Sequence, residues 1–357
     1  MRFYLSFLFV LAVLQGIAQE NVSYGSSREY FGKEDNVTRV FLDKNGDFYP
    51  SFSIIEEEFK KADFSLREYS NAVLDITELT DSIWLEIQEE TVSGLAEEIN
   101  SRIGQEENLY VFMHGFRKPS EPINGDTSAH DDYAFIRSEI NQATDKENYF
   151  LEIYWDGMYL KPEHSLKFVT SLGKMFKKQA VGNAERAGLG LRKIFSKIEK
   201  EKITIISHSL GAEVACNLLF NDNENAGFAT PKQNIEVCLV APAISKKKFK
   251  NYYNRNKENH FVDSDNYRLT VIYNELDFVL SKTSKILGIR ISFSRIYGNT
   301  RLGCNCGNEA YELEKYFKKH FPFSLIHLIH ASSFGSSHHS LSYFGSNEFR
   351  EFIIDKY

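Results

Sequence analysis

The chain has 357 residues, with 42 Lys and Arg against 49 Asp and Glu, and a formal net charge of −7. This acidic balance argues against a nucleic-acid-binding role, because phosphate backbones attract basic surfaces. Its 42% hydrophobic content, with 29 Phe and 19 Tyr, is enough for a real core and excludes a disordered or low-complexity protein.

The first 18 residues have the pattern of a secretory signal peptide. A basic start at Arg2 precedes an apolar stretch over residues 3–14, and Gly16 and Ala18 then provide a small-x-small cleavage site. The stretch is too short to span a bilayer of ~30 Å comfortably, and no later apolar run is long enough to do so. We therefore expect removal of residues 1–18, export to a periplasmic or secreted location, and no transmembrane segment.

Four cysteines in an exported chain could pair, but their positions do not favour it. Cys216 and Cys238 fall in a predicted helix and a predicted strand, where a buried Cys usually acts as a small apolar residue. Cys304 and Cys306 are too close in sequence for an easy mutual disulfide, and they lack the C-x2-C pairs of a zinc site. We expect neither a structural disulfide nor a bound metal.

Residues 19–50 are polar with little periodicity, so we expect an N-terminal arm there and a single domain over residues 51–357. Beyond the arm, short apolar segments alternate with segments of helical periodicity. We predict strands at 71–76, 109–113, 149–155, 203–206, 235–240 and 269–273. We predict helices at 91–103, 133–142 and 212–220, and two helices within 164–199, where Gly182, Gly188 and Gly190 interrupt the periodicity.

The alternation of strands and helices predicts the fold class. Residues 109–113 form a continuous apolar run, which suits a central strand covered on both faces. Helices between successive strands favour parallel pairing, because a parallel connection has to cross the sheet. We therefore expect an α/β fold with a mostly parallel central sheet and helices on both faces.

The segment Ser207-His208-Ser209-Leu210-Gly211 lies between the predicted strand 203–206 and a predicted helix. A sharp strand-to-helix turn projects its central residue out of the sheet and brings the next backbone N–H to the same spot. A serine there can attack a substrate if a base takes its proton and donors hold the oxyanion. We predict Ser209 as the nucleophile and the Leu210 N–H as an oxyanion donor. Ser207 replaces the usual first glycine of G-x-S-x-G, but it is still small.

Three segments, at residues 109–117, 154–157 and 205–214, together resemble the α/β-hydrolase superfamily. They are especially similar to its bacterial branch of uncharacterised, lipase-like serine hydrolases. The resemblance covers roughly residues 70–350 and implies the α/β-hydrolase fold. It also implies a small-molecule ester or lipid-like substrate and no cofactor. In this family a strand that ends in His-Gly leads into a loop with the second oxyanion donor, which here points to the Phe116 N–H.

The resemblance also implies the chain order nucleophile, acid, histidine. Asp277 lies at the end of the strand predicted next but one after Ser209 and is our choice for the acid, with Glu275 as the alternative. The base is expected in a loop near the C-terminus. We favour His339, because a His followed by Ser and then Tyr-Phe resembles the terminal loop of the family, and His338 remains the alternative base.

These features predict an exported serine hydrolase that cleaves a carboxylic ester through an acyl-enzyme on Ser209. Amide hydrolysis or acyl transfer would use the same residues. The alternative is a non-catalytic binding or surface protein that retains the fold, since a fold alone does not determine function. The position of His338 and His339 relative to Ser209 Oγ distinguishes the two hypotheses.

Overall fold

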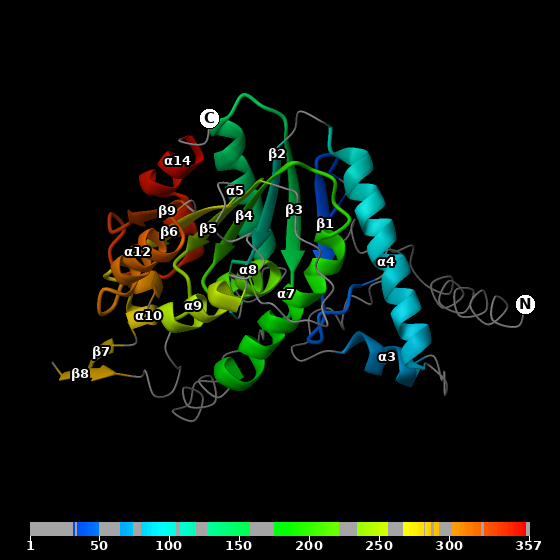
Figure 1. The fold of residues 1–357 in the computed structure, drawn as a ribbon, viewed down its shortest axis with the longest axis horizontal. Helices are drawn as coiled ribbons and strands as arrows, with labels where there is room; N and C mark the ends of the chain where they lie inside the picture. The colour runs from blue at the N-terminus through cyan, green and yellow to red at the C-terminus, as the bar shows by residue number, and fades with distance from the viewer. Residues whose placement is uncertain are drawn as a thin grey trace, which may run out of the picture.

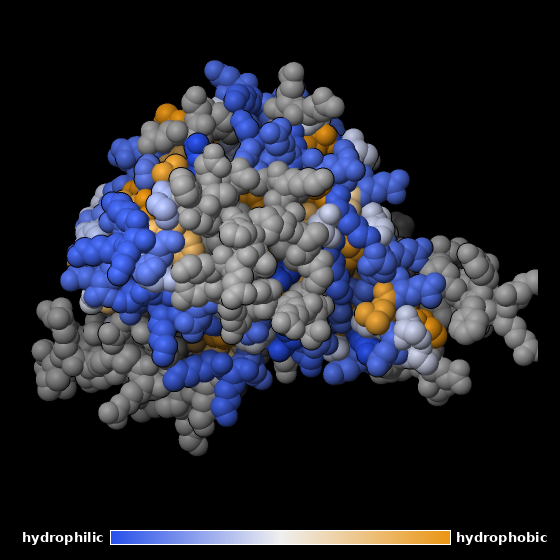
Figure 2. All heavy atoms as spheres, viewed as in Figure 1, coloured by the Kyte–Doolittle hydropathy of each residue, from blue (hydrophilic) through white to orange (hydrophobic). Residues whose placement is uncertain are grey.

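The computed structural model describes residues 31–32, 34–49, 65–73, 80–104, 108–116, 118, 127–157, 175–220, 234–255, 267–281, 283–286, 289–292, 302–322 and 325–354. The expected signal peptide, residues 1–18, lies outside these residues. Within them, no helix combines the length and the apolar character that crossing a bilayer requires. Among the coloured side chains on the face in Figure 2, most are hydrophilic, and the hydrophobic ones form small separate groups.

In the described part of the chain, seven strands form one sheet in the order β1-β3-β2-β4-β5-β6-β9 (Figure 1), and every neighbouring pair is parallel. The carboxyl ends of β4, β6 and β9 therefore meet at one edge of the sheet. A separate antiparallel hairpin pairs β7 with β8. The strand bounds are β1 Val37–Phe41, β2 Asn108–Met113, β3 Asn148–Tyr154, β4 Lys202–His208, β5 Asn234–Val240, β6 Tyr267–Tyr273, β7 Thr283–Ile286, β8 Ile289–Ser292 and β9 Leu325–His330.

Helices cover both faces of the sheet. On one face α4, α7, α8, α9 and α12 pack in succession, and on the other α5, α13 and α14 pack together. Figure 1 shows α7 and α8 in front of the strands. The bounds are α3 Leu66–Val73, α4 Asp81–Arg102, α5 Ala129–Ala143, a π-helical turn η2 Phe176–Ala180, α7 Val181–Phe195, α8 Gly211–Leu219, α9 Lys246–Arg255, α10 Phe278–Ser281, a 3-10 turn η5 Leu302–Cys304, α12 Glu309–His320, α13 Ser340–Phe344 and α14 Asn347–Ile354.

The α/β fold class with a parallel central sheet is confirmed, and five predicted strands, now β2 to β6, shift by only a few residues. The strand predicted at 71–76 is wrong over its described part, since residues 71–73 end α3. The start of α3 is fixed by polar groups, because Ser65 Oγ accepts from the Glu68 N–H at 3.2 Å and Asp43 Oδ2 from the Leu66 N–H at 2.7 Å. Such caps stabilise a helix that apolar periodicity does not indicate.

The expected N-terminal arm contains β1, the edge strand beside β3. Two polar residues of this strand are buried, which hides it from a search for apolar runs. Arg39 forms an ion pair with Glu152 of β3 at 3.0 Å, with 1% and 0% of the two side chains exposed. Thr38 Oγ1 lies 2.6 Å from the Tyr149 hydroxyl. Since a buried charge requires a partner, this network specifies the position of β1 against β3.

Helix α7 runs without interruption through the three glycines that the sequence suggested as breaks. One of them, Gly188, allows α7 to touch α8 closely, because an added methyl group would lie 2.5 Å from Val214 O and 2.7 Å from Asn217 Cβ. Arg192 of α7 also donates to Asn217 O at 2.8 Å, near the carboxyl end of α8. These contacts with α7 fix the position of α8, the helix that follows Ser209.

Replacing Gly188 with Ala is expected to lower the free energy of unfolding by about 1–3 kcal/mol, because the methyl group overpacks the α7–α8 contact. Gly182→Ala in the same helix is the matched control. Its methyl group would meet the flexible Arg186 side chain at 3.3 Å, so we expect no loss, or a gain of up to about 1 kcal/mol. Urea unfolding measures both, and equal effects would contradict the account of the contact.

Candidate active site

Ser209 occupies the sharp turn between β4 and α8 in a left-handed conformation, with φ of 52°. A non-glycine residue rarely adopts this conformation, and it persists only where the surroundings hold it. Here the Ser209 N–H donates to Val240 O at 3.0 Å, and Ser209 O accepts from the Ala243 N–H at 2.9 Å. The turn therefore presents the serine side chain at the carboxyl edge of the sheet, where 7% of the residue is exposed.

Small residues around Ser209 make this turn sterically possible. A methyl group on Gly211 would lie 2.4 Å from Met113 O, and one on Gly115 would lie 2.9 Å from Ser209 Cβ. Ser207, where the motif usually has glycine, is fully buried within β4. Leu210 directly precedes α8, so its N–H belongs to a helix start, which leaves amides without intrahelical partners.

His338 lies between Ser209 and Asp277. Its Nε2 is 2.9 Å from Ser209 Oγ, and its Nδ1 is 2.6 Å from Asp277 Oδ2. In the neutral imidazole, Nδ1–H donates to the carboxylate and Nε2 accepts from the serine hydroxyl. The three residues come from the ends of β4, β6 and the segment after β9, so the parallel sheet brings them to one edge. This is the geometry that activates a serine nucleophile.

Asp277 is fully buried, and several donors hold its carboxylate. Oδ1 accepts from the Val279 and Leu280 N–H groups at 3.0 Å each, at the start of α10. Oδ2 accepts from the Tyr343 hydroxyl at 2.8 Å in addition to His338. Burial, together with the Asp277 carboxylate, raises the pKa of Tyr343 well above its usual range, so this hydroxyl stays a donor. Glu275, the alternative acid, instead accepts from Asn305 Nδ2 at 2.8 Å.

The preference for His339 as the base is corrected by this geometry, because the alternative, His338, faces Ser209. His339 is exposed, and its Nε2 lies 3.3 Å from Thr127 Oγ1. Its backbone is extended, with φ of −70° and ψ of 131°. Consecutive side chains of an extended segment point in opposite directions, so only one of two adjacent histidines can face the serine. The sequence pattern does not specify which one.

His114 holds the loop that leads to Phe116. Its Nδ1 lies 3.0 Å from Gly115 O, its Nε2 accepts from the Trp155 N–H at 3.3 Å, and the Trp155 indole N–H donates to His114 O at 2.9 Å. Burial lowers the pKa of His114 to about 4, so the ring stays neutral and Nε2 can accept. The Phe116 ring packs edge-on against Phe176, with ring centroids 5.1 Å apart.

His208 and Tyr343 are two neighbours of the site that sequence reasoning missed. The His208 ring centroid lies 5.1 Å from that of His338, and burial holds the pKa of His208 well below its usual value. An uncharged His208 can pack beside His338 without repelling its protonated form. The place of His208 within the serine motif could have indicated that it lies near the site. Nothing in the sequence connects Tyr343 with Asp277.

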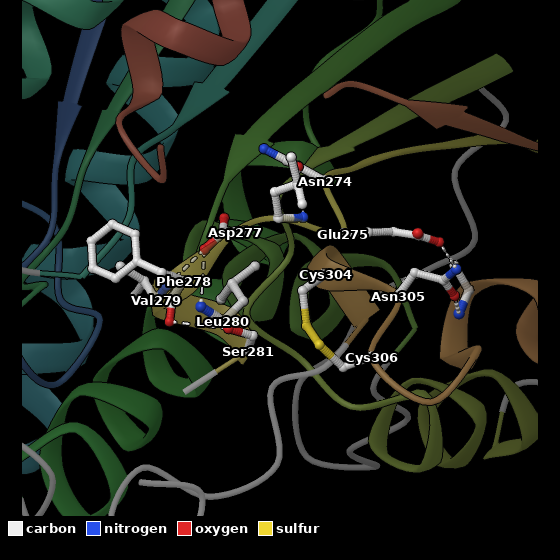
Figure 3. The surroundings of a disulfide bond; sticks show 12 residues. Asn274, Glu275, Asp277, Phe278, Val279, Leu280, Ser281, Cys304, Asn305 and Cys306 are labelled. Atoms are coloured by element: carbon white, nitrogen blue, oxygen red, sulfur yellow. Dashed lines mark hydrogen bonds between the residues drawn. A yellow bond between two sulfur atoms is a disulfide. The ribbon is translucent and has the colours of Figure 1, made fainter. Parts of the chain in front are cut away.

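A disulfide joins Cys304 to Cys306, which corrects the expectation that these cysteines are too close to pair. Asn305 between them has φ of 47°, a left-handed conformation that Asn tolerates well, and it turns the chain so that the two Cα atoms are 5.2 Å apart. Figure 3 shows the disulfide beside the acid turn, residues 274–277. Gly303 O accepts from the Asn274 N–H at 2.9 Å, so the bridged turn supports the segment that carries Asp277.

The oxidised protein is expected to expose two reactive thiols after denaturation, those of Cys216 and Cys238, because Cys304 and Cys306 are bridged. Alkylation followed by peptide mass spectrometry counts them, and prior reduction should raise the count to the four cysteines of the chain. Four labelled cysteines without reduction would contradict the bridge.

Acid should destabilise the fold through His114. An unfolded histidine binds its proton near pH 6.5, whereas burial delays protonation of folded His114 until about pH 4. The unfolded state thus binds more protons in this window, and stability is lost as the pH falls from about 6.5 to about 4. One residue accounts for about 3 kcal/mol of that loss.

His114→Gln removes this titrating group, and comparison with the unmodified protein cancels the other titrations. Urea unfolding at pH 6.5 and pH 4.5 measures the difference. We expect the variant to lose about 2–3 kcal/mol less than the unmodified protein over this interval. An identical loss in both proteins would contradict a buried neutral His114.

Residues 175–347 match a family model described as alpha/beta hydrolase of unknown function (DUF900). No curated protein matches the sequence. Among solved structures, an uncharacterized protein from Bacillus cereus ATCC 10987 is 13% identical with a TM-score of 0.38, covering 85% of this chain and 79% of that one. A lipase-esterase related protein from Clostridium acetobutylicum ATCC 824 is 11% identical with a TM-score of 0.32, covering 71% of this chain and 96% of that one.

Acetyl xylan esterase 1 from Thermoanaerobacterium sp. JW/SL YS485 is 10% identical with a TM-score of 0.35, covering 71% of this chain and 76% of that one. Structural similarities at such low sequence identity say nothing about the substrate of this chain. The family match includes β4 to β6, β9 and the three residues of the hydrogen-bonded chain. Together with this match, the parallel sheet shows that the protein has the α/β-hydrolase fold.

Proposed function

We propose that the protein is an exported serine hydrolase that cleaves a carboxylic ester through an acyl-enzyme on Ser209. The observation that carries the proposal is the continuous chain of hydrogen bonds from Ser209 Oγ through His338 to Asp277, at 2.9 Å and 2.6 Å. A serine hydroxyl is a weak nucleophile unless a base of this kind takes its proton. Export rests on the signal-peptide pattern of residues 1–18.

In the proposed reaction, Ser209 Oγ attacks the ester carbonyl carbon while His338 Nε2 takes the hydroxyl proton. The carbonyl oxygen becomes an oxyanion, which the N–H groups of Leu210 and Phe116 stabilise. Asp277 orients the imidazole and stabilises its protonated form. His338 then gives the proton to the alkoxide that leaves as an alcohol. Water attacks the acyl-enzyme by the same route in reverse, which releases the acid and restores Ser209.

The strained turn favours this activity over a non-catalytic role for the retained fold. A left-handed non-glycine residue costs of order 1–3 kcal/mol, and such strain clusters at active sites. Apolar side chains near the site suit an ester with an apolar part, since Leu276, Phe278 and Val279 flank Asp277 and are 55%, 56% and 43% exposed.

A fluorophosphonate probe should label Ser209 of the folded protein, and Ser209→Ala should abolish the label. His338→Ala should lower kcat/KM for p-nitrophenyl acetate by about 10³-fold or more, because removal of the base leaves only oxyanion stabilisation and binding. His339→Ala is the matched control on the adjacent residue, with an expected loss of less than about tenfold. Failure to label the unmodified protein, or equal losses in the two histidine variants, would contradict the proposal.

A further inference from the structure

Lys118 is the centre of a polar cluster beside the proposed site, formed with Thr127, Asp132 and Ser340. Its ammonium group lies 2.8 Å from Asp132 Oδ2, and it donates to Thr127 Oγ1 at 2.7 Å and to Ser340 Oγ at 3.4 Å. The cluster is largely shielded from water, since 15% of the Lys118 side chain and 5% of the Asp132 side chain are exposed. We call these four residues the Lys118 cluster.

The Lys118 cluster joins three separate segments of the chain. Lys118 comes two residues after Phe116, which is the proposed oxyanion donor. Ser340 comes two residues after His338 and begins α13. Thr127 and Asp132 belong to the start of α5, where Ser128 and Asp131 cap each other reciprocally and fix the first turn. A rigid helix start therefore anchors both the oxyanion loop and the segment that carries the base.

The buried carboxylate of Asp132 explains why the central residue of the Lys118 cluster is a lysine. Burial raises the pKa of Asp132, and the nearby Lys118 cation opposes that shift. The other carboxylate oxygen, Asp132 Oδ1, is buried and has no hydrogen-bond partner among the described residues. Lys118 thus supplies the main compensation for a buried charge. Its three donors are directed at Asp132, Thr127 and Ser340, which favours a structural tie over binding of a substrate anion.

We propose that Lys118 is a positioning residue for the reaction of Ser209, an inference that rests on the proposed function. Its ammonium group ties the Phe116 loop and the His338 segment to the start of α5. The oxyanion donor and the base therefore keep a fixed separation from each other and from Ser209. Reactions of this kind are sensitive to such geometry, because a misplacement of about 1 Å can cost about 10²-fold in rate.

Lys118→Met tests this directly in the full-length protein, with p-nitrophenyl acetate as substrate and a fluorophosphonate as the probe of Ser209. We expect kcat and the labelling rate to fall about 10- to 100-fold, with KM changed by less than about threefold, because positioning acts on the reacting atoms and not on substrate binding. Ser340→Ala loosens only the histidine segment and should lower kcat by a smaller factor, about 3- to 10-fold.

Arg350→Met is the matched control on the same anchor helix. It removes a cation from Glu139 of α5, 2.6 Å away, without touching either loop, and we expect kcat within about twofold of the unmodified protein. If Lys118→Met fails to fold, the double variant Lys118→Met/Asp132→Asn replaces it, because no unpaired buried charge remains. The same loss in kcat is expected there.

Three results would overturn the inference alone: labelling and kcat equal to those of the unmodified protein, a rise in KM with kcat unchanged, or an equal loss of kcat in Arg350→Met. The second result would make Lys118 a substrate-binding group, and the third would make the loss a general effect of weakened packing. An unmodified protein that the probe does not label would instead overturn the proposed function, and this inference with it.

Discussion

The left-handed turn at Ser209 is the constraint on which the arrangement of the site depends. The turn ends β4 and starts α8 within two residues. A side chain on Gly211 would collide with Met113 O, and one on Gly115 would collide with Ser209 Cβ. Hydrogen bonds from the adjacent strand β5 and its following segment hold the strained backbone, through Val240 and Ala243. The sheet therefore stabilises one unfavourable conformation, which places the Ser209 side chain at its carboxyl edge.

The parallel sheet then determines where the other groups lie. Because β4, β6 and β9 are parallel, the segments after them emerge at the same edge, which brings Asp277 and His338 to Ser209 from far along the chain. The acid turn has support of its own from α10 and from the bridged turn at Cys304. The parallel strands thus bring the three residues to one edge of the sheet, and these local contacts fix the position of Asp277 relative to His338.

Among the described residues, the buried carboxylates follow one physical rule, since each of them has at least one donor directed at it. Glu152 pairs with Arg39 at the edge of the sheet, and Asp277 accepts from backbone, tyrosine and histidine donors. The Lys118 cluster belongs to the same pattern but joins loops instead of strands. The buried histidines follow the converse rule, because burial lowers their pKa and keeps their rings neutral.

Strong local patterns made much of the fold predictable. Continuous apolar runs indicated β2, β4 and β5, and the strand–turn–helix context singled out Ser209. Chain order, carried over from the resemblance, indicated Asp277, which the geometry places against a histidine.

The features that the sequence did not predict share a physical cause. Each of them depends on contacts between residues distant in sequence or on a local dihedral angle. Strand β1 is hidden by polar residues whose partners lie on β3, and the start of α3 is fixed by Asp43. The choice between His338 and His339 depends on the direction of one extended segment. The bridge at Cys304 depends on the left-handed Asn305.

Trapping of the acyl-enzyme is the most stringent test of Ser209 as the nucleophile. The protein is mixed with p-nitrophenyl acetate, quenched in acid within the first turnover and digested for peptide mass spectrometry. We predict an acetyl group on Ser209, together with a burst of p-nitrophenol close to one equivalent per protein that Ser209→Ala lacks. An acetyl group elsewhere, or a burst that survives Ser209→Ala, would contradict the account.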